Sequence, residues 1–194
     1  KESDVYNPSS PYSATKASSD HLVRAWNKTF NLPAIITNCS NNYGPFQFPE
    51  KLIPKTIILA NQKQKIPIYG KGTNVRDWIY VDDHCDGVLT AFLKGKSGES
   101  YNFSGNNEIN NLVIVKKILE LINKSEDLIE FVEDRPGHDF RYSMSSEKIS
   151  KELGWKPKVN FEKGIQDTIK WYLDHEDHWK DSPSSIFNPT PWKN

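Results

Sequence analysis

The sequence predicts an α/β domain with a partly parallel sheet. Short apolar runs of the kind that form buried strands alternate along the chain with longer segments whose apolar residues recur at helical spacing. This alternation is typical of strands joined by helices that cover the sheet. The chain has 194 residues, of which 36% are hydrophobic, and that is enough for one globular domain with its own core.

The first predicted helix extends from Ser10 to about Thr29. Ser10 can cap the helix, and the proline that follows suits the first turn, where its missing N–H is not needed. Leu22, Val23 and Trp26 fall on one face at helical spacing. An asparagine and a proline just beyond Thr29 end the helix.

The later elements follow from the same kinds of signal. A polar loop, CSNNYGPFQFP, comes after the first strand, and a glycine turn at 70–72 precedes the second. Asn110 or Asn111 can cap the fourth helix, and the Ser- and Pro-rich tail after Trp179 is predicted to be extended. Strands are predicted at 34–38, 76–81, 99–105 and 129–133, with helices at about 50–64, from Asp82 or Asp83 onward, and at about 112–123, 146–153 and 161–174.

Charge and hydropathy exclude several classes of function. The 25 Lys and Arg residues balance 25 Asp and Glu, so the chain has no global basic field for nucleic acid or an anionic membrane. The apolar run at 57–60 is far shorter than the roughly 20 residues of a membrane span, and the first residues lack the apolar core of a signal peptide. We expect a cytoplasmic protein with no nucleic-acid partner and no membrane partner.

Cysteine and histidine patterns give no sign of a metal centre. Cys39 and Cys85 lie far apart and outside any CxxC motif, which favours two reduced, partly buried thiols over a lone disulfide. His175 and His178 have helical spacing, but their acidic neighbours favour a solvated helix terminus over a metal site. We expect no bound metal.

Tyr12 and Lys16 are four residues apart and therefore share a face of the first helix. A lysine ammonium beside a phenol favours the phenolate, which can take a proton from a hydroxyl. Chance predicts about one such spacing in a chain of this composition, so the spacing alone also fits a surface tyrosine above a solvated lysine. The first-turn position and the small residues around the pair favour the catalytic interpretation, because a flat cofactor could approach there.

Asn41 and Asn42 follow the first predicted strand. Ligands bind beyond the carboxyl ends of strands in open α/β sheets, and side-chain amides can both donate to and accept from sugar hydroxyls or phosphate. The alternative is a turn that is rich in Asn and Gly for backbone reasons.

Arginine is rare in this lysine-rich chain, with four among 25 basic residues. Arg76 and Arg135 could supply the planar fork that fits phosphate. Each could instead form an ion pair with its neighbour, Asp77 or Asp134. Arg24, inside the first helix, is interpreted as structural.

Several motifs together resemble a known enzyme family. The stretch YSATKASSDHLV resembles the catalytic helix of the extended short-chain dehydrogenase/reductases, and NNYGP resembles an element of nucleotide-sugar enzymes. Epimerases and decarboxylases share these single motifs. Over about residues 8–174, the order and spacing resemble the dTDP-glucose 4,6-dehydratases, most specifically through FPEKLIP and RPGHDFRY, and also through IPIYGKG, VRDWIYVDDH, YNFSG, NEINNL and KISKELGWKP.

The resemblance implies the C-terminal part of a Rossmann-like NAD(P)-binding fold plus a smaller mixed α/β substrate-binding domain. Residues 1–45 would end the Rossmann-like part, residues 46–180 would mainly bind the nucleotide sugar, with some elements returning to the Rossmann sheet, and residues 181–194 would form an extended tail. The ten glycines form no GxGxxG or GxxGxxG turn, and the Asp-Glu pair with which the family eliminates water has no match. We therefore expect a portion of the enzyme that is inactive alone, and a homodimer in the whole enzyme.

The resemblance also assigns roles to single residues. Tyr12 would be the base and Lys16 its partner, both in contact with NAD, while Asn41 would contact the sugar nucleotide and Asn42 the cofactor. The remaining substrate contacts would be Lys51, Leu52, Pro67, Ile68 and Tyr69 around the nucleotide, Arg76 on the diphosphate, and Asn111, Arg135, His138 and Asp139 at the nucleoside end.

The implied activity is NAD-dependent dehydration of dTDP-glucose to dTDP-4-keto-6-deoxyglucose. Two other interpretations stay open on the sequence alone. One is an epimerase or decarboxylase of the same family, and the other is a non-catalytic module for nucleotide-sugar binding or assembly.

Overall fold

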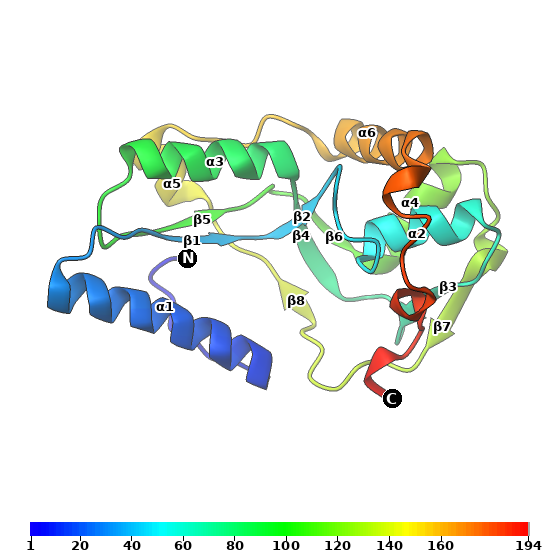
Figure 1. Cartoon of the computed structure of the whole chain (residues 1–194), viewed down its shortest axis with the longest axis horizontal. Helices are drawn as coiled ribbons and strands as arrows, with labels where there is room; N and C mark the ends of the chain where they lie inside the picture. Colours follow the sequence, from blue (N-terminus) through cyan, green and yellow to red (C-terminus); the bar gives the residue numbers. More distant parts are fainter. Residues whose placement is uncertain (194) are drawn as a thin grey trace.

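The computed structural model describes residues 1–193 and confirms the α/β class (Figure 1). Strands and helices alternate along most of the chain. In order they are α1 (Pro11–Phe30), β1 (Ile36–Cys39), β2 (Asn41–Tyr43), α2 (Leu52–Asn61), β3 (Ile66–Tyr69), β4 (Val75–Tyr80), α3 (Val81–Lys94), β5 (Ser100–Phe103), β6 (Glu108–Asn110), α4 (Asn111–Leu121), β7 (Ile129–Val132), β8 (Arg141–Tyr142), α5 (Glu147–Leu153) and α6 (Phe161–Asp174).

Most strand pairs are parallel, as predicted. β1 pairs with β5, β2 with β4, and β3 with β7, all in parallel register. β4 also pairs with β8 in parallel and with β6 in antiparallel register. Only Ser40 separates β1 from β2, and its N–H donates to the carbonyl of Phe103 at 2.9 Å, which keeps the two pairings close to one another.

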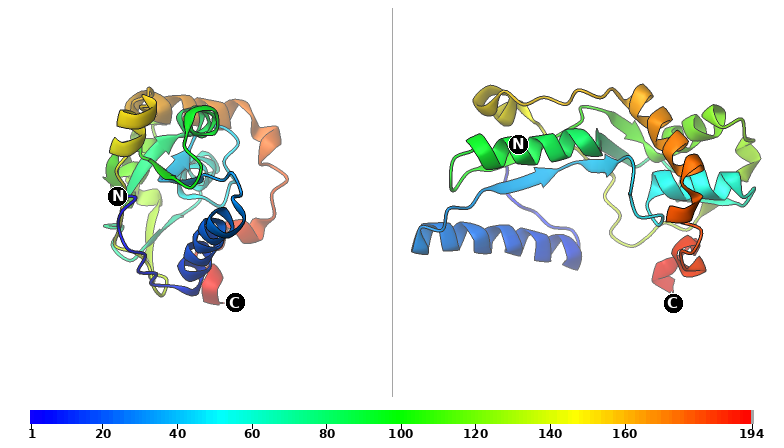
Figure 2. Two further views of the ribbon diagram at one scale, coloured as in Figure 1. Left: turned by 90° about the vertical axis from the view of Figure 1, so that its left-hand side faces the viewer. Right: turned by 45° about the horizontal axis from the view of Figure 1, so that its top comes forward.

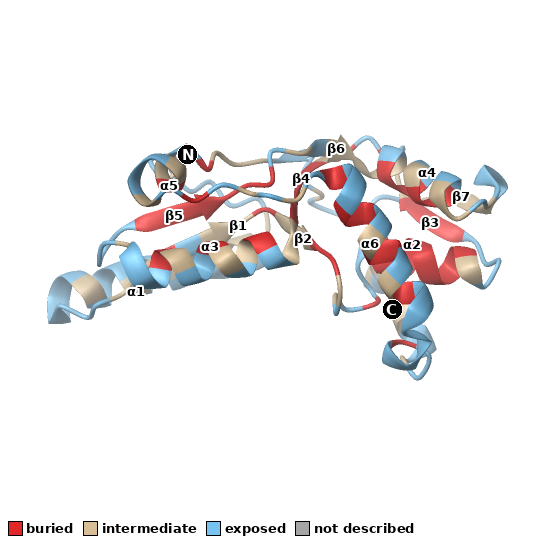
Figure 3. Ribbon diagram, turned by 90° about the horizontal axis from the view of Figure 1, so that it is seen from above, coloured by how far each residue is buried: buried red, intermediate tan, exposed pale blue. Residues whose placement is uncertain are grey.

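The core divides into two lobes that meet at β4 (Figures 1 and 3). We call one the β1 lobe, made of α1, β1, β5, α3 and α5, and the other the β3 lobe, made of α2, α4, α6, β3, β7 and the tail 181–193. Adjacent residues of a strand point to opposite faces. Accordingly, Trp78 of β4 packs into the β3 lobe, while Ile79 packs with Tyr101, Phe103 and Trp155 in the β1 lobe.

Helix α1 begins and ends as predicted, but its apolar face is not buried. Ser10 forms a capping box, in which its Oγ accepts from the Ser13 N–H at 3.2 Å and the Ser13 Oγ accepts from the Ser10 N–H at 3.0 Å. Asn31 ends the helix in the left-handed conformation, with φ of 53°. Leu22 and Trp26 are 61% and 53% exposed.

The third helix begins slightly before its predicted start at Asp82 or Asp83. The helix begins at Val81 without a side-chain cap, so both acids lie inside its first turn. The buried carboxylate of Asp83 instead accepts from the backbone N–H groups of Lys158 and Val159, at 3.0 and 2.9 Å. This acid therefore holds the segment between α5 and α6 against α3.

The structure adds elements where the sequence predicted loop. Strand β2 lies inside the predicted polar loop, and β3, β6 and β8 each have two to four residues. Such short strands carry little local signal, because their pairing partners are distant in the sequence. The tail is not simply extended either, since it forms single 3₁₀ turns at Ser184–Phe187 and Pro191–Lys193.

Candidate functional site

The start of α1 presents Tyr12 and Lys16 to solvent on successive turns. Both side chains are exposed, that of Tyr12 at 75%. The capping box of Ser10 fixes the backbone of this turn and leaves the phenol accessible. An accessible phenol beside an ammonium group can exchange a proton with a bound hydroxyl.

Residues of β1 and β8 lie within electrostatic reach of this pair. Burial raises the pKa of the Cys39 thiol, while the amide of Asn42 and the charge of Lys16 act in the opposite direction. Burial also raises the pKa of Tyr142, and the ionisable neighbours that act on it include Cys39, Asp139, Tyr12 and Arg76. Tyr142 is also the strand partner of Arg76, so it lies beside one of the predicted nucleotide residues.

The side chain of Asn42 is already hydrogen-bonded within the chain. Its amide nitrogen donates to the Cys39 sulfur at 3.2 Å and to the Ser40 carbonyl at 3.3 Å, and its oxygen lies 2.9 Å from Nδ1 of His84. Burial lowers the pKa of His84, so the ring is neutral at pH 7 and donates its Nδ1 proton to that oxygen. One lone pair of the Asn42 oxygen is left for a ligand, whereas the half-buried Asn41 beside it makes none of these contacts.

Arg76 is buried and held by backbone carbonyls. Its guanidinium donates to the carbonyls of Val75 at 2.7 Å, Phe140 at 3.4 Å and Asp139 at 2.7 Å. A guanidinium has five N–H groups, so two remain for a bound anion. Burial lowers the pKa of Arg76, which still leaves it charged at neutral pH.

Asp139 joins the segment before α1 to Arg76 of β4. Its carboxylate accepts from the Ser9 hydroxyl at 2.9 Å, and its carbonyl accepts from Arg76 and from the Asn74 amide at 3.2 Å. The segment just before the Tyr12 helix is thereby tied to the loop at 134–140. The side chain of Asp139 acts as a bridge within the protein.

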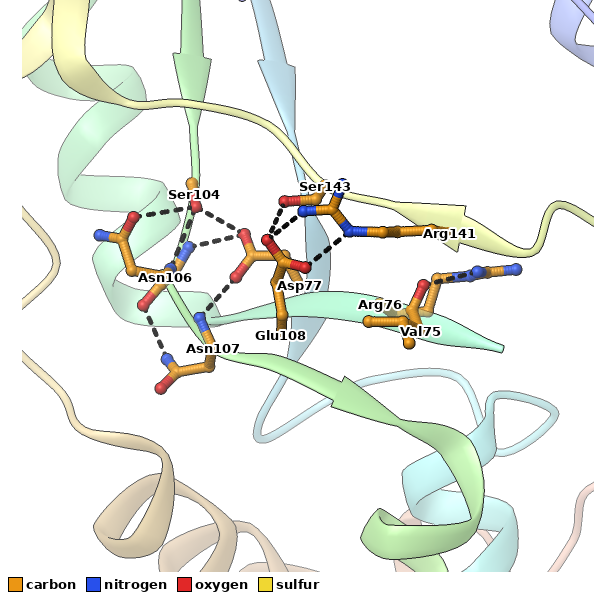
Figure 4. A network of polar contacts seen from close by, with 10 residues as sticks. Val75, Arg76, Asp77, Ser104, Asn106, Asn107, Glu108, Arg141 and Ser143 are labelled. Carbon is orange, nitrogen blue, oxygen red and sulfur yellow. Dashed lines mark hydrogen bonds and ion pairs between the residues drawn. The ribbon is translucent and has the colours of Figure 1, made fainter. Parts of the chain in front are cut away.

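The alternative that Arg76 pairs with Asp77 is wrong. Asp77 faces the other way and is fully buried (Figure 4). Its carboxylate accepts from the Ser104 hydroxyl at 2.7 Å and from the N–H groups of Gly105 at 3.0 Å and Asn107 at 2.7 Å. A Cβ at Gly105 would lie 1.8 Å from the Trp78 carbonyl, so only glycine lets the turn after β5 approach β4 this closely.

The loop at 134–140 places His138 beside Tyr69. The Asp134 carboxylate contacts Nδ1 of His138 at 2.6 Å, and among residues 1–193 it forms no ion pair with the exposed Arg135. Burial nevertheless lowers the pKa of His138, against the opposing effect of Asp134. The rings of His138 and Tyr69 are near-perpendicular, with centroids 6.3 Å apart.

The other predicted residues lie around the β3 lobe with unequal access to a ligand. Ile68 is 2% exposed and packs in the core, so a ligand could meet β3 through the side chain of Tyr69 or through the backbone. Pro67 is buried and Leu52 half-buried, while Lys51 is exposed with its ammonium 3.7 Å from Glu50. Asn111 begins α4, and its N–H donates to the Asn74 carbonyl at 3.1 Å.

Sequence reasoning missed three residues that bond to or pair with predicted site residues, namely His84, Asn74 and Tyr142. Each lies inside or next to a motif that was noted for another residue. The signal that could have found Asn74 and Tyr142 is their position beside Arg76 and in RPGHDFRY.

Three further facts bear on the chemistry. Over the described residues 1–193, no group of three or more His, Cys, Asp or Glu is placed to hold a metal ion. No helix in that range has the length and apolarity needed to cross a membrane. Both cysteines are free, Cys39 half-buried and Cys85 exposed.

The fold is that of an α/β protein in which most strand pairs are parallel. The sequence profile described as GDP-mannose 4,6 dehydratase matches residues 1–168, and the chain belongs to that family. Within it, the chain is 54% identical over 179 residues to a dTDP-glucose 4,6-dehydratase of Shigella flexneri, an alignment that covers 89% of this chain and 50% of the relative. The chain thus spans about half the length of the curated relatives it matches.

Solved structures of nucleotide-sugar enzymes are also similar to this chain. A dTDP-glucose 4,6-dehydratase of Bacillus anthracis in complex with NAD superposes with a TM-score of 0.89 at 47% identity, covering 93% of this chain and 57% of that one. A UDP-glucuronic acid 4-epimerase of Bacillus cereus, in complex with UDP-glucuronic acid and NAD, superposes with a TM-score of 0.85 at 28% identity, covering 90% and 56%. The fold is therefore common to both activities, and the sequence is nearer to the dehydratase.

Proposed function

We propose that this chain is the base-carrying and substrate-binding part of an NAD-dependent dTDP-glucose 4,6-dehydratase, which forms dTDP-4-keto-6-deoxyglucose. The observation that carries the proposal is the bridge at Asp139. It joins Ser9, just before the Tyr12 helix, to Arg76, the residue predicted to bind the diphosphate. The difference in identity between the dehydratase and epimerase structures, 47% against 28%, supports this reaction over epimerisation.

Tyr12 is proposed to take the proton of the sugar 4-hydroxyl. Its exposed phenol is accessible to the sugar, and Lys16 lies on the next turn of the same helix face. Tyr12 and Lys16 would hold the nicotinamide end of NAD, which would supply the hydride acceptor and donor of the reaction.

The residues present fit one end of NAD. Lys16 is free in solvent to bind the nicotinamide ribose, and the small residues near Tyr12 leave space for a flat ring. A pyrophosphate needs a glycine-rich turn at a helix N-terminus, and none of the ten glycines forms that motif. We therefore propose that this chain contributes the nicotinamide side of the cofactor site and is inactive as it stands.

The substrate grip is proposed to lie at the junction of the two lobes. The two remaining N–H groups of Arg76 and the exposed Arg135 suit a diphosphate, and the ring of Tyr69 suits a base. Between the two asparagines, Asn41 has the freer side chain and is the better candidate for a polar contact to the sugar. Lys51, Leu52, Pro67, Ile68, Asn111 and His138 would complete the surroundings of the nucleotide.

We also propose that the whole enzyme is a cytoplasmic homodimer. Leu22, Trp26 and Phe30 form an exposed apolar stripe on α1, which supports a contact between two copies through this helix. Sedimentation of the chain over a range of concentrations tests this, and a constant monomer mass would contradict it.

Binding and turnover test the proposed function separately. We expect the chain to bind thymidine diphosphate more tightly than uridine diphosphate by calorimetry, and Arg76→Ala to weaken that binding. With dTDP-glucose and NAD, we expect no turnover by the chain alone. A preference for uridine diphosphate would favour the epimerase or decarboxylase, and robust turnover would contradict inactivity of this chain.

Fusion to the N-terminal half of the Shigella flexneri relative tests the role of Tyr12. In an active fusion, Tyr12→Phe should lower kcat about 10²- to 10⁴-fold, the usual contribution of a general base, with nucleotide binding unchanged. Lys28→Ala, at the far end of α1, is the matched control and should keep full activity. Equal activity of the two variants would remove Tyr12 from the reaction.

A further inference from the structure

The C-terminal tail folds back over the β3 lobe. In Figures 1 and 2 the red segment passes beside β3 and β7. Buried Trp179 starts it, with its indole N–H donating to the Tyr172 carbonyl at 2.9 Å. Half-buried Phe187 then packs against the core of the lobe. The tail is therefore anchored by apolar contacts before it reaches its last turn.

The last turn of the tail lies against Tyr69. The Trp192 and Tyr69 rings have centroids 4.9 Å apart and an interplanar angle of 82°. The next residue, Lys193, pairs with Glu133, just before the loop that carries Arg135 and His138. Tyr69 is thus contacted by the tail as well as by His138.

This contact comes from outside the part of the chain that defines the family. The family profile ends at residue 168, whereas Tyr69 belongs to the IPIYG motif within it. Exposed ion pairs such as Lys193–Glu133 stabilise weakly, since both side chains are at least half exposed. The aromatic contact and Phe187 are therefore the main interactions that place the tail at this motif.

We propose that Trp192 forms a wall of the nucleoside pocket and contacts the base of the bound nucleotide. Two near-perpendicular aromatic rings form a corner in which a flat base can stack on one ring and present its edge to the other. The tail then acts as a strap that brings Trp192 to the base. This inference rests on the proposed function, because it takes Tyr69 as part of the nucleoside site.

Calorimetric titration with thymidine diphosphate tests the inference. Trp192→Ala should weaken binding about two- to tenfold, the range expected for loss of one aromatic pair. Trp192→Phe should keep most of the affinity. Phe92→Ala removes an exposed aromatic side chain of α3 and is the matched control, which should bind like the unsubstituted chain.

Inorganic diphosphate separates contact with the base from a general disturbance of the site. It lacks a base, so its affinity should be the same for Trp192→Ala and the unsubstituted chain. Unchanged or tighter binding of thymidine diphosphate by Trp192→Ala would overturn the inference, as would an equal loss for inorganic diphosphate. If the unsubstituted chain bound no thymidine diphosphate at all, the proposed function itself would fail and the inference with it.

Discussion

Helices α1 and α6 differ in the burial of their apolar faces. Six residues of α6 are buried, whereas none of residues 11–30 in α1 is buried, and Figure 3 shows the same contrast. Helix α6 packs on α2, α4 and β4. Helix α1 is held by its cap and by polar contacts such as Arg24 to the Ser100 hydroxyl at 2.9 Å and Asn27 to the Ser97 hydroxyl at 3.0 Å.

This difference in burial separates the proposed nucleotide-binding residues from the proposed catalytic base. The residues proposed to hold the nucleotide lie on or beside the packed β3 lobe, while the proposed base lies on the least packed helix. Regions with few buried apolar contacts open locally at low free-energy cost. We therefore expect Tyr12 to depend on further contacts to α1, and the nucleotide site to be ordered largely by the core of the β3 lobe.

The largest expected effect is a difference in the free energy of unfolding when one apolar residue is substituted in each helix. Ile165 of α6 is fully buried, so Ile165→Ala should lower the free energy of unfolding by about 2–5 kcal/mol. Leu22 of α1 is 61% exposed in the single chain, so Leu22→Ala should change it by less than about 0.5 kcal/mol at a concentration at which the chain is monomeric. Urea denaturation measures both, and similar losses would contradict the difference between the lobes.

A smaller effect is expected at the link between α6 and the asparagine loop. The Tyr172 hydroxyl donates to the Gln47 carbonyl, and the Gln47 amide donates to the Asn42 carbonyl at 2.7 Å. Tyr172→Phe should cost about 1 kcal/mol of unfolding free energy, because it removes one net hydrogen bond. Tyr6→Phe removes an exposed hydrogen bond from the segment before α1 to Asp20 of that helix, so it should cost less and is the control.

The smallest expected effect is a change in pH dependence at His84. Burial lowers the pKa of His84 below its ordinary value of about 6.5, so the unfolded chain binds this proton more readily than the folded one. The stability linked to His84 is therefore present above pH 6.5 and is lost as pH falls towards the folded pKa. His84→Gln should flatten this part of the stability profile.

The exposed His21 of α1 offers a control for that measurement. Unfolding free energies from pH 8 to pH 5 should show a shallower slope for His84→Gln than for His21→Gln. Identical slopes would mean that burial of His84 has no effect on folding.

The elements that the sequence predicted well are those with strong local signals. The capping residues Ser10 and Asn110 and the helical periodicity of α4 and α6 all act within a few residues. Strand β4 was predicted because its run of strand-forming residues is long enough to give a local signal. Strands β2, β3, β6 and β8 were not predicted, because pairing across the sheet determines them.

The same division applies to the candidate site. The sequence by itself determined that Tyr12 and Lys16 share a helix face, because helical spacing is local, and its motifs named the arginines and the family. Tertiary structure decided that Arg76 donates to the Asp139 carbonyl rather than pairing with adjacent Asp77, and that Trp192 reaches Tyr69. Partners more than 60 residues apart meet only through packing and strand pairing, which no local pattern encodes.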